Sequence, residues 1–130
     1  MPLRSRDLAL VAVGGVVGSL LRYAVGTAVP HAAGGWPWST VAVNVAASLL
    51  IGVVAGWAHW RHAAHWVRPL VMSGVLGGFS TYSAFAVDTV SLAEGGSDAL
   101  AAAYVVVTLI ACIGAAAVGT VVAGRLWQQP

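Results

Sequence analysis

Polar side chains interrupt the apolar stretches of this chain, and their types indicate what chemistry they can support. Arg22 and Asn44 stand alone, whereas hydroxyl groups gather within GVLGGFSTYSAFAVDT, which runs from Gly74 to Thr89. Such groups in apolar surroundings need a partner or a water-filled path, because burying them unpaired is costly. A chain this small contains many of them: Arg22, Asn44, Ser80, Thr81, Tyr82, Ser83, Asp88, Tyr104 and Thr108.

The spacing of the last polar residues predicts a polar track along one helix. Tyr104, Thr108 and Cys112 are separated by four residues each, which places them on one helix face. Amide and hydroxyl donors, together with the positive edges of aromatic rings, suit a small anion. The residues therefore predict a path for an anion or a small polar solute. The alternative is that these groups hydrogen-bond between helices or to their own helix.

The glycines that precede the hydroxyl cluster predict a break in a helix. Gly77 and Gly78 weaken helical structure, and the hydroxyl residues that follow can satisfy the freed backbone groups. Carbonyls freed in such a break can coordinate a cation, as in transporters with discontinuous helices. The segment is therefore predicted to be an ion site.

The elements that must position these residues follow from composition. Of 130 residues, 59% are hydrophobic and only 8% are charged, and there is no lysine. Four apolar stretches, residues 8–29, 39–57, 67–93 and 99–123, each approach the ~20 residues that cross a membrane as a helix. The sequence predicts an all-α membrane protein with a single domain over residues 1–130. It has four transmembrane helices, and the third is broken at mid-membrane.

The arginines predict the orientation of these helices. Five of six arginines fall on the side shared by the termini and the second loop, which favours termini in the cytoplasm: Arg4, Arg6, Arg61, Arg68 and Arg125. A cleaved signal peptide is disfavoured because the first apolar run is long and contains Arg22. Closely spaced glycines are interpreted as helix packing positions: Gly14 with Gly18, Gly52 with Gly56, and Gly74 with Gly78.

Several residues allow more than one role. Arg22 can line an anion-concentrating vestibule or extend to the membrane interface, and Asp88 can pair with an arginine or belong to a polar cluster. His59, His62 and His65 are spaced too loosely for a convincing metal site, so an interfacial belt is favoured. The single cysteine cannot form an intrachain disulfide.

Three segments give the chain a family resemblance. GGVVGSLLRYAVG, WPWSTVAVNVAASLLIG and GVLGGFSTYSAFAVDT, in this order, resemble the CrcB, or Fluc, family of fluoride channels. The similarity extends over all four predicted spans. It implies a channel rather than an enzyme. Such a channel lets cytoplasmic fluoride leak passively out of the cell and so reduces its toxicity.

The resemblance also implies an assembly and roles for particular residues. Family subunits pair antiparallel into a dual-topology dimer in the cell membrane, with two fluoride pores and one sodium ion on the dyad. The sodium would be held by the backbone carbonyls of Gly77 and Ser80. The implied partners are fluoride, the lipid bilayer and a second subunit, with no nucleic acid. The implied pore residues are Asn44, Tyr82, Phe85, Ser83, Tyr104, Thr108 and Cys112, with Thr40 near the mouth.

The sequence departs from the family pattern at a few positions. Tyr82 stands where phenylalanine is usual, Ala84 replaces a frequent threonine, and Cys112 takes the place of an expected serine. The unequal arginine distribution indicates insertion mainly with termini inside, and pairing with an oppositely oriented homologue is then an alternative to the homodimer.

Two other classes of protein compete with the channel. A small multidrug transporter needs a carboxylate within the first span, and residues 8–29 contain none. A structural or assembly subunit of a membrane complex needs only the packing glycines, but it leaves the broken helix and the hydrogen-bond donors unexplained.

Overall fold

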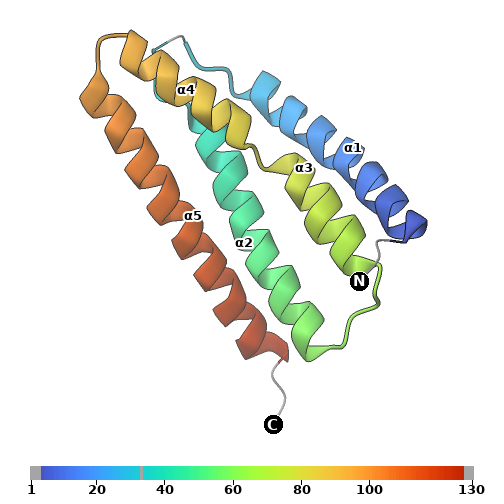
Figure 1. The fold of residues 1–130 in the computed structure, drawn as a ribbon. Helices are drawn as coiled ribbons and strands as arrows, with labels where there is room; N and C mark the ends of the chain where they lie inside the picture. The colour runs from blue at the N-terminus through green and yellow to red at the C-terminus, as the bar shows by residue number, and fades with distance from the viewer. Residues whose placement is uncertain (1–3, 33, 128–130) are drawn as a thin grey trace.

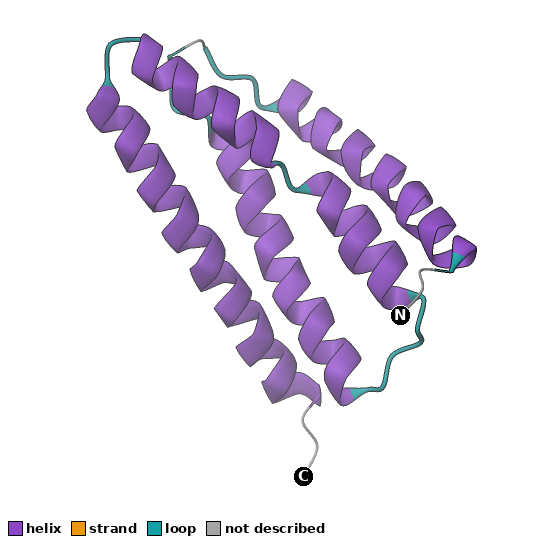
Figure 2. Cartoon of the chain, in the orientation of Figure 1, coloured by secondary structure: helices purple, strands orange, loops and turns teal. Residues whose placement is uncertain are grey.

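The described residues fold into helices joined by short loops and form no strand (Figures 1 and 2). The structure is a computed structural model that describes residues 4–32 and 34–127. Its helices are α1 (Ser5–Ala28), α2 (Trp38–Trp60), η1 (Arg68–Leu76), α3 (Gly77–Phe79), α4 (Tyr82–Glu94) and α5 (Asp98–Trp127).

Four helical stretches are long and apolar enough to cross a membrane, with η1, α3 and α4 together forming the third. Even the 23-residue α2 is ~35 Å long, which exceeds the hydrocarbon core of a bilayer. The all-α prediction with four transmembrane helices is confirmed. The helix bounds differ by a few residues from those of the apolar stretches that predicted them.

Local sequence explains where several helices begin and end. Asp7 and Asp98 lie in the first turns of α1 and α5, and Arg125 lies in the last turn of α5, so each charge complements the helix dipole. Gly96, with φ 85°, turns the chain between α4 and α5. In the third span, η1 is a π-helix that contains Pro69 at its start.

The helices pack in two close groups that run side by side in Figure 1. In the first group, α1 packs against η1 and α3, and glycines allow the backbones to touch. A Cβ on Gly14 would overlap the Leu70 carbonyl oxygen, and one on Gly18 would overlap that of Val75. A Cβ on Gly78 would lie 2.6 Å from the Gly15 carbonyl oxygen. These glycines therefore set the distance between α1 and the third span.

The second group consists of α2 and α5, with α4 packed mainly against α5. A Cβ on Gly52 would overlap the Ala116 carbonyl oxygen, and one on Gly119 would overlap that of Leu49. Gly56 likewise faces the Ala123 side chain. The predicted packing role of the paired glycines is confirmed in both groups.

The third span is broken, but the break does not lie at the two glycines. Gly77 keeps helical angles, φ −66° and ψ −38°, and Gly78 is also helical. The chain leaves the helix at Ser80 and Thr81, which are extended with ψ 156° and 120° (the link between α3 and α4 in Figure 1). The predicted break in the third span is confirmed; it follows the two glycines, and Gly78 itself stays helical and packs closely against α1.

Few side chains are buried within the single chain. The main core cluster consists of Leu92, Ala101 and Tyr104, with Trp36 and Phe85 packed against it. Large apolar side chains cover the outer surface of the helices, as expected for a protein surrounded by lipid or by another subunit. The start of α1, the α2–η1 loop and the end of α5 lie at one end of the molecule (Figure 1).

Candidate functional site

Asn44 on α2 holds the two halves of the broken span. Its Nδ2 donates to the Thr81 carbonyl oxygen at 3.0 Å, and its Oδ1 accepts from the Thr81 backbone nitrogen at 2.7 Å. The Thr81 hydroxyl accepts from the Ala84 nitrogen at 3.1 Å and so caps the start of α4. The amide therefore replaces the hydrogen bonds that a continuous helix would supply.

A cavity of about 250 Å³ opens beside this break. Its lining contains no charged side chain, so we call it the neutral cavity; it is formed by Asn44, Ser48, Ser80, Thr81, Tyr82, Phe85, Thr108, Leu109 and Cys112. Residues from α2, α4 and α5 meet here, together with the residues of the break. An anion entering this cavity would find amide and hydroxyl donors but no fixed positive charge to trap it.

Aromatic rings continue from the neutral cavity toward the α1–α2 loop. The centroids of Tyr82 and Phe85 are 6.0 Å apart, and those of Phe85 and Tyr104 are 5.3 Å apart. Trp36 then meets Tyr104 edge to face at 5.7 Å. The Tyr82 side chain is 82% exposed in the single chain, whereas Tyr104 is fully buried. Ring edges are the positive parts of these side chains and can face an anion.

Thr108 gives the neutral cavity a free polar group. The residue is only 4% exposed, and its Oγ1 has no hydrogen-bond partner among the described residues. Buried hydroxyls are normally paired, because an unpaired one costs about 1–3 kcal/mol. Cys112, one turn further along α5, lines the same cavity as a free thiol. The unpaired hydroxyl is the feature expected where a ligand or ion completes the site.

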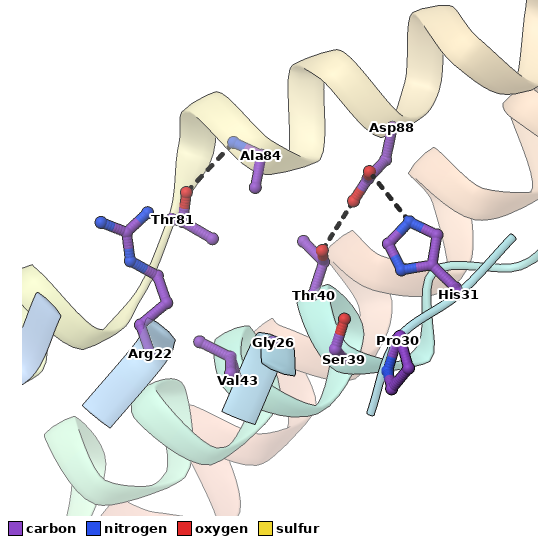
Figure 3. A pocket seen from close by; sticks show the side chains of 10 residues that line it. All are labelled: Arg22, Gly26, Pro30, His31, Ser39, Thr40, Val43, Thr81, Ala84 and Asp88. Atoms are coloured by element: carbon purple, nitrogen blue, oxygen red, sulfur yellow. Dashed lines mark hydrogen bonds and ion pairs between the residues drawn. The ribbon is translucent and has the colours of Figure 1, made fainter. Parts of the chain in front are cut away.

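A second cavity, of about 360 Å³, is also lined by Thr81 (Figure 3). We call it the charged cavity, because its lining includes Arg22 and Asp88: Arg22, Gly26, Pro30, His31, Ser39, Thr40, Val43, Thr81, Ala84 and Asp88. Thr81 lines both cavities. The break is therefore the place where the two cavities approach each other.

Three side chains from three parts of the chain contact the Asp88 carboxylate, and we call this set the carboxylate cluster. Thr40 Oγ1 donates to Oδ2 at 2.6 Å, and the Tyr104 hydroxyl reaches the same oxygen at 3.4 Å. His31 Nε2 lies 3.4 Å from Oδ1 (Figure 3). Asp88 thus belongs to a polar cluster, which was one of the two predicted alternatives.

The other alternative, a pair between Asp88 and an arginine, is not found within the described part of the chain. Arg22 extends toward Thr81, at the far end of the charged cavity from Asp88 (Figure 3). Its Nε is buried and has no hydrogen-bond partner among the described residues. Arg22 therefore places a positive charge beside the break, and its vestibule role stays a prediction.

The structure brings most of the predicted site residues together, but divides them between the neutral cavity and the carboxylate cluster. Asn44, Tyr82, Phe85, Thr108 and Cys112 share the neutral cavity. Thr40 and Tyr104 instead bind Asp88. Ser83 lines neither cavity in the single chain; it is exposed, with its Oγ 3.3 Å from Thr81 Oγ1.

Sequence reasoning missed His31, Ser48 and Trp36. His31 comes directly after Pro30 in a loop, and no local pattern connects it with a carboxylate 57 positions further on. The available signal was Asp88 itself, since a carboxylate predicted inside a membrane needs a partner. Ser48 follows Asn44 by one helical turn and could have been placed on the same face.

The backbone at the break presents carbonyl groups of the kind a hard cation prefers. Gly77 and Ser80 lie at the C-terminal end of the helix formed by η1 and α3, where carbonyls carry partial negative charge. Ser80 Oγ reaches the Gly77 carbonyl oxygen at 3.4 Å, a long contact that leaves the carbonyl free for stronger interactions. These oxygens suit sodium in type, because hard cations take oxygen ligands.

The fold and its two cavities define the class of the protein. It is a small integral membrane protein with four membrane-crossing stretches. The third stretch is interrupted beside a cavity that is lined by hydrogen-bond donors. Irregular backbone at membrane depth is characteristic of proteins that pass ions or solutes, because lipid cannot satisfy its polar groups.

Comparison with known proteins places the chain within this class. Residues 9–120 match the family model described as "CrcB-like protein, Camphor Resistance (CrcB)". The chain therefore belongs to the CrcB family, and the resemblance found in the sequence is confirmed.

The relatives are similar over nearly their whole length. A fluoride-specific ion channel FluC of Agrobacterium fabrum is 41% identical over 93% of this chain and 98% of its own. The protein of the same name from Hyphomonas neptunium is 39% identical over 91% and 95%. Fluoride-specific ion channel FluC 1 of Frankia casuarinae is 43% identical over 91% and 96%. Neither competing class, the multidrug transporter or the assembly subunit, gains support from these relatives.

Proposed function

We propose that this protein is a channel that lets fluoride cross the membrane by passive electrodiffusion and so lowers its concentration in the cytoplasm. The names of the relatives support this function, and one structural observation carries it. The neutral cavity combines the Asn44 amide, the unpaired Thr108 hydroxyl and the Phe85 ring beside a helix break. The family and the names of the relatives indicate a channel rather than an enzyme.

The lining explains why a small anion is favoured. Fluoride is the smallest halide and the strongest hydrogen-bond acceptor among the halides, so short contacts with amide and hydroxyl donors can replace its hydration shell. Neutral donors bind an anion without the deep trap that a buried cation would create. Conduction needs binding that is favourable enough for entry and weak enough for release, and a neutral lining meets both conditions.

Fluoride efflux from liposomes tests the proposal. Purified protein is reconstituted into liposomes loaded with either fluoride or chloride, and efflux is followed with an ion-selective electrode. We expect rapid fluoride release that protein-free liposomes lack, with little chloride release. A preparation that is folded and reconstituted but releases fluoride no faster than empty liposomes would contradict the proposed function.

We infer that the working unit contains a second, antiparallel subunit. Tyr82 lines the neutral cavity yet is 82% exposed, so the single chain leaves this wall of the cavity open. A second copy of the chain is the first choice for this partner. An oppositely oriented homologue is the alternative, since five of six arginines lie at one end and one orientation should dominate.

Cysteine labelling separates the two assemblies and tests the predicted cytoplasmic location of the termini. Cys112 is first replaced by serine, and a single cysteine is then placed near Arg4 or Arg125. When the chain is expressed alone in cells, labelling by a membrane-impermeant reagent from one side only supports fixed orientation and a partner homologue. Equal labelling from both sides supports the antiparallel homodimer.

We also propose a structural sodium ion held by the Gly77 and Ser80 carbonyls. Their position at a helix end inside the membrane supports it, because the partial negative charge there needs compensation. Sodium would neutralise this charge and join two subunits at the dyad. Replacing sodium with N-methylglucamine in the detergent buffer should lower the melting temperature of the dimer. An unchanged melting temperature would contradict the sodium proposal without affecting the fluoride proposal.

A further inference from the structure

A third cavity lies next to the carboxylate cluster, on the side of the α1–α2 loop. We call this space of about 240 Å³ the loop cavity; its lining is His31, Gly34, Gly35, Asp88, Ser91 and Leu92. His31 and Asp88 are the residues that line both the loop cavity and the charged cavity. The ion pair therefore stands between the two spaces.

The charges around this pair come from several elements. On α4, Asp88 carries the negative charge, and Thr40 of α2 and Tyr104 of α5 donate to its Oδ2. Arg22 of α1 lines the charged cavity but lies away from the carboxylate (Figure 3). His31, from the loop, is thus the only titratable cationic group in contact with Asp88 among the described residues.

The two partners differ in their access to water. The His31 side chain is 31% exposed, whereas that of Asp88 is 13% exposed. A proton can reach the imidazole from the loop side, while the carboxylate stays within the cluster. Histidine is also the side chain whose charge ordinarily changes between about pH 5 and 8. The imidazole is therefore the member of the ion pair that is open to the surrounding solution.

We propose that His31 is a positioning residue that makes anion entry depend on pH, by compensating the charge of Asp88 when it is protonated. The inference rests on the proposed fluoride conduction. Protonated His31 holds the Asp88 carboxylate and neutralises the cluster, so an anion passes it without net repulsion. Neutral His31 leaves the carboxylate charge uncompensated between the two cavities, and this charge repels an approaching anion. Fluoride flux therefore rises as the pH falls.

Efflux at two pH values, with variants that fix the charge at position 31, tests this inference. Fluoride efflux is measured at about pH 5.5 and about pH 8, chosen to bracket ordinary histidine titration. The pH is equal on both sides of the liposome, so the orientation of the protein does not matter. Leakage of hydrogen fluoride through lipid is measured in protein-free liposomes and subtracted. The variants are His31→Gln, which is neutral, and His31→Arg, which stays positive, with His59→Gln as the matched control.

We expect wild-type flux to be about three to five times higher at the lower pH, the size of effect for one charge in contact with water. His31→Gln should give the low flux at both pH values, and His31→Arg should give the high flux at both. His59 is exposed in the last turn of α2, at the end of that helix away from the α1–α2 loop, so its variant should follow wild type.

Two results would overturn the inference alone: an unchanged pH profile in His31→Gln, or wild-type flux that decreases on acidification. The second result would mean that the ion pair closes the path between the two cavities. Loss of fluoride flux at both pH values in the wild type would overturn the proposed function together with the inference. Because His31 is in a loop and partly exposed, its variants should keep the fold, which size-exclusion chromatography checks.

Discussion

The neutral cavity and the charged cavity share Thr81, but they differ in whether another threonine hydroxyl in the lining already has a hydrogen-bond partner. In the neutral cavity, the buried Thr108 hydroxyl has no partner among the described residues. In the charged cavity, the Thr40 hydroxyl is already bound to Asp88 at 2.6 Å. A donor without a partner is available to a passing anion, whereas one held by a carboxylate is not.

This difference suits the two cavities to different tasks, the selection of the anion and the control of its entry. The neutral cavity is suited to replace the hydration shell of an anion, because its buried Thr108 hydroxyl gains a partner only when the ion arrives. The charged cavity is suited to regulate the approach, because a carboxylate and its counter-charges act over a longer distance than a hydrogen bond. Substitutions in the first cavity should therefore affect flux more strongly than substitutions in the second.

The largest effect is expected for Asn44→Ala. The change removes both hydrogen bonds that hold Thr81 and one donor of the neutral cavity. Loss of about 3 kcal/mol of favourable interaction corresponds to a flux about 100 times lower in the liposome assay. Ser48→Ala is the control, because Ser48 lines the same cavity but forms no hydrogen bond to the break among the described residues. Equal losses in both variants would show that Asn44 has no special role.

A smaller but still large loss is expected for Phe85→Ala. The side chain lines the neutral cavity and packs between the rings of Tyr82 and Tyr104. Its removal takes away a ring edge and one aromatic contact on each side, worth about 0.5–1.5 kcal/mol each, so flux should fall about 10- to 30-fold. Val87→Ala, at a 63% exposed position on the same helix, should conduct normally. Normal flux in Phe85→Ala would exclude this ring from the pathway.

The charged cavity is probed by Asp88→Asn. Removing the negative charge should raise fluoride flux about three- to fivefold at neutral pH and remove its pH dependence. The new side chain can still accept from Thr40 and Tyr104, so the fold should be retained. The measurement is the same efflux assay between about pH 5.5 and 8. A loss as large as that of Asn44→Ala would mean that the carboxylate cluster is part of the selective site.

The smallest effect is expected for Tyr82→Phe. The variant restores the residue that is usual in the family and removes only a hydroxyl from an 82% exposed side chain. Flux should change by less than about threefold, the size of one net hydrogen bond. The melting temperature should not change. A much larger change in flux would show that the Tyr82 hydroxyl itself contacts the ion, and would move the selective site toward the subunit interface.

Sequence reasoning reached much of the fold and part of the site. The four spans follow from hydropathy, and the packing role of Gly14, Gly18 and Gly52 follows from their spacing. The set Asn44, Tyr82, Phe85, Thr108 and Cys112 came from the family resemblance, and the structure brings these residues into one cavity. The break lies in the predicted segment, at Ser80 and Thr81, but only the structure shows that Gly78 stays helical and packs against Gly15.

The sequence by itself determined that this chain lies in a membrane as four helical spans, because apolar runs of sufficient length have no other stable arrangement there. It also determined that polar groups inside those spans need partners. Only the tertiary structure decided which partners they have. Asp88 binds Thr40, Tyr104 and His31, from residues far apart along the chain. Such pairings depend on how helices cross and where loops return, and the spacing of residues along one helix does not contain this information.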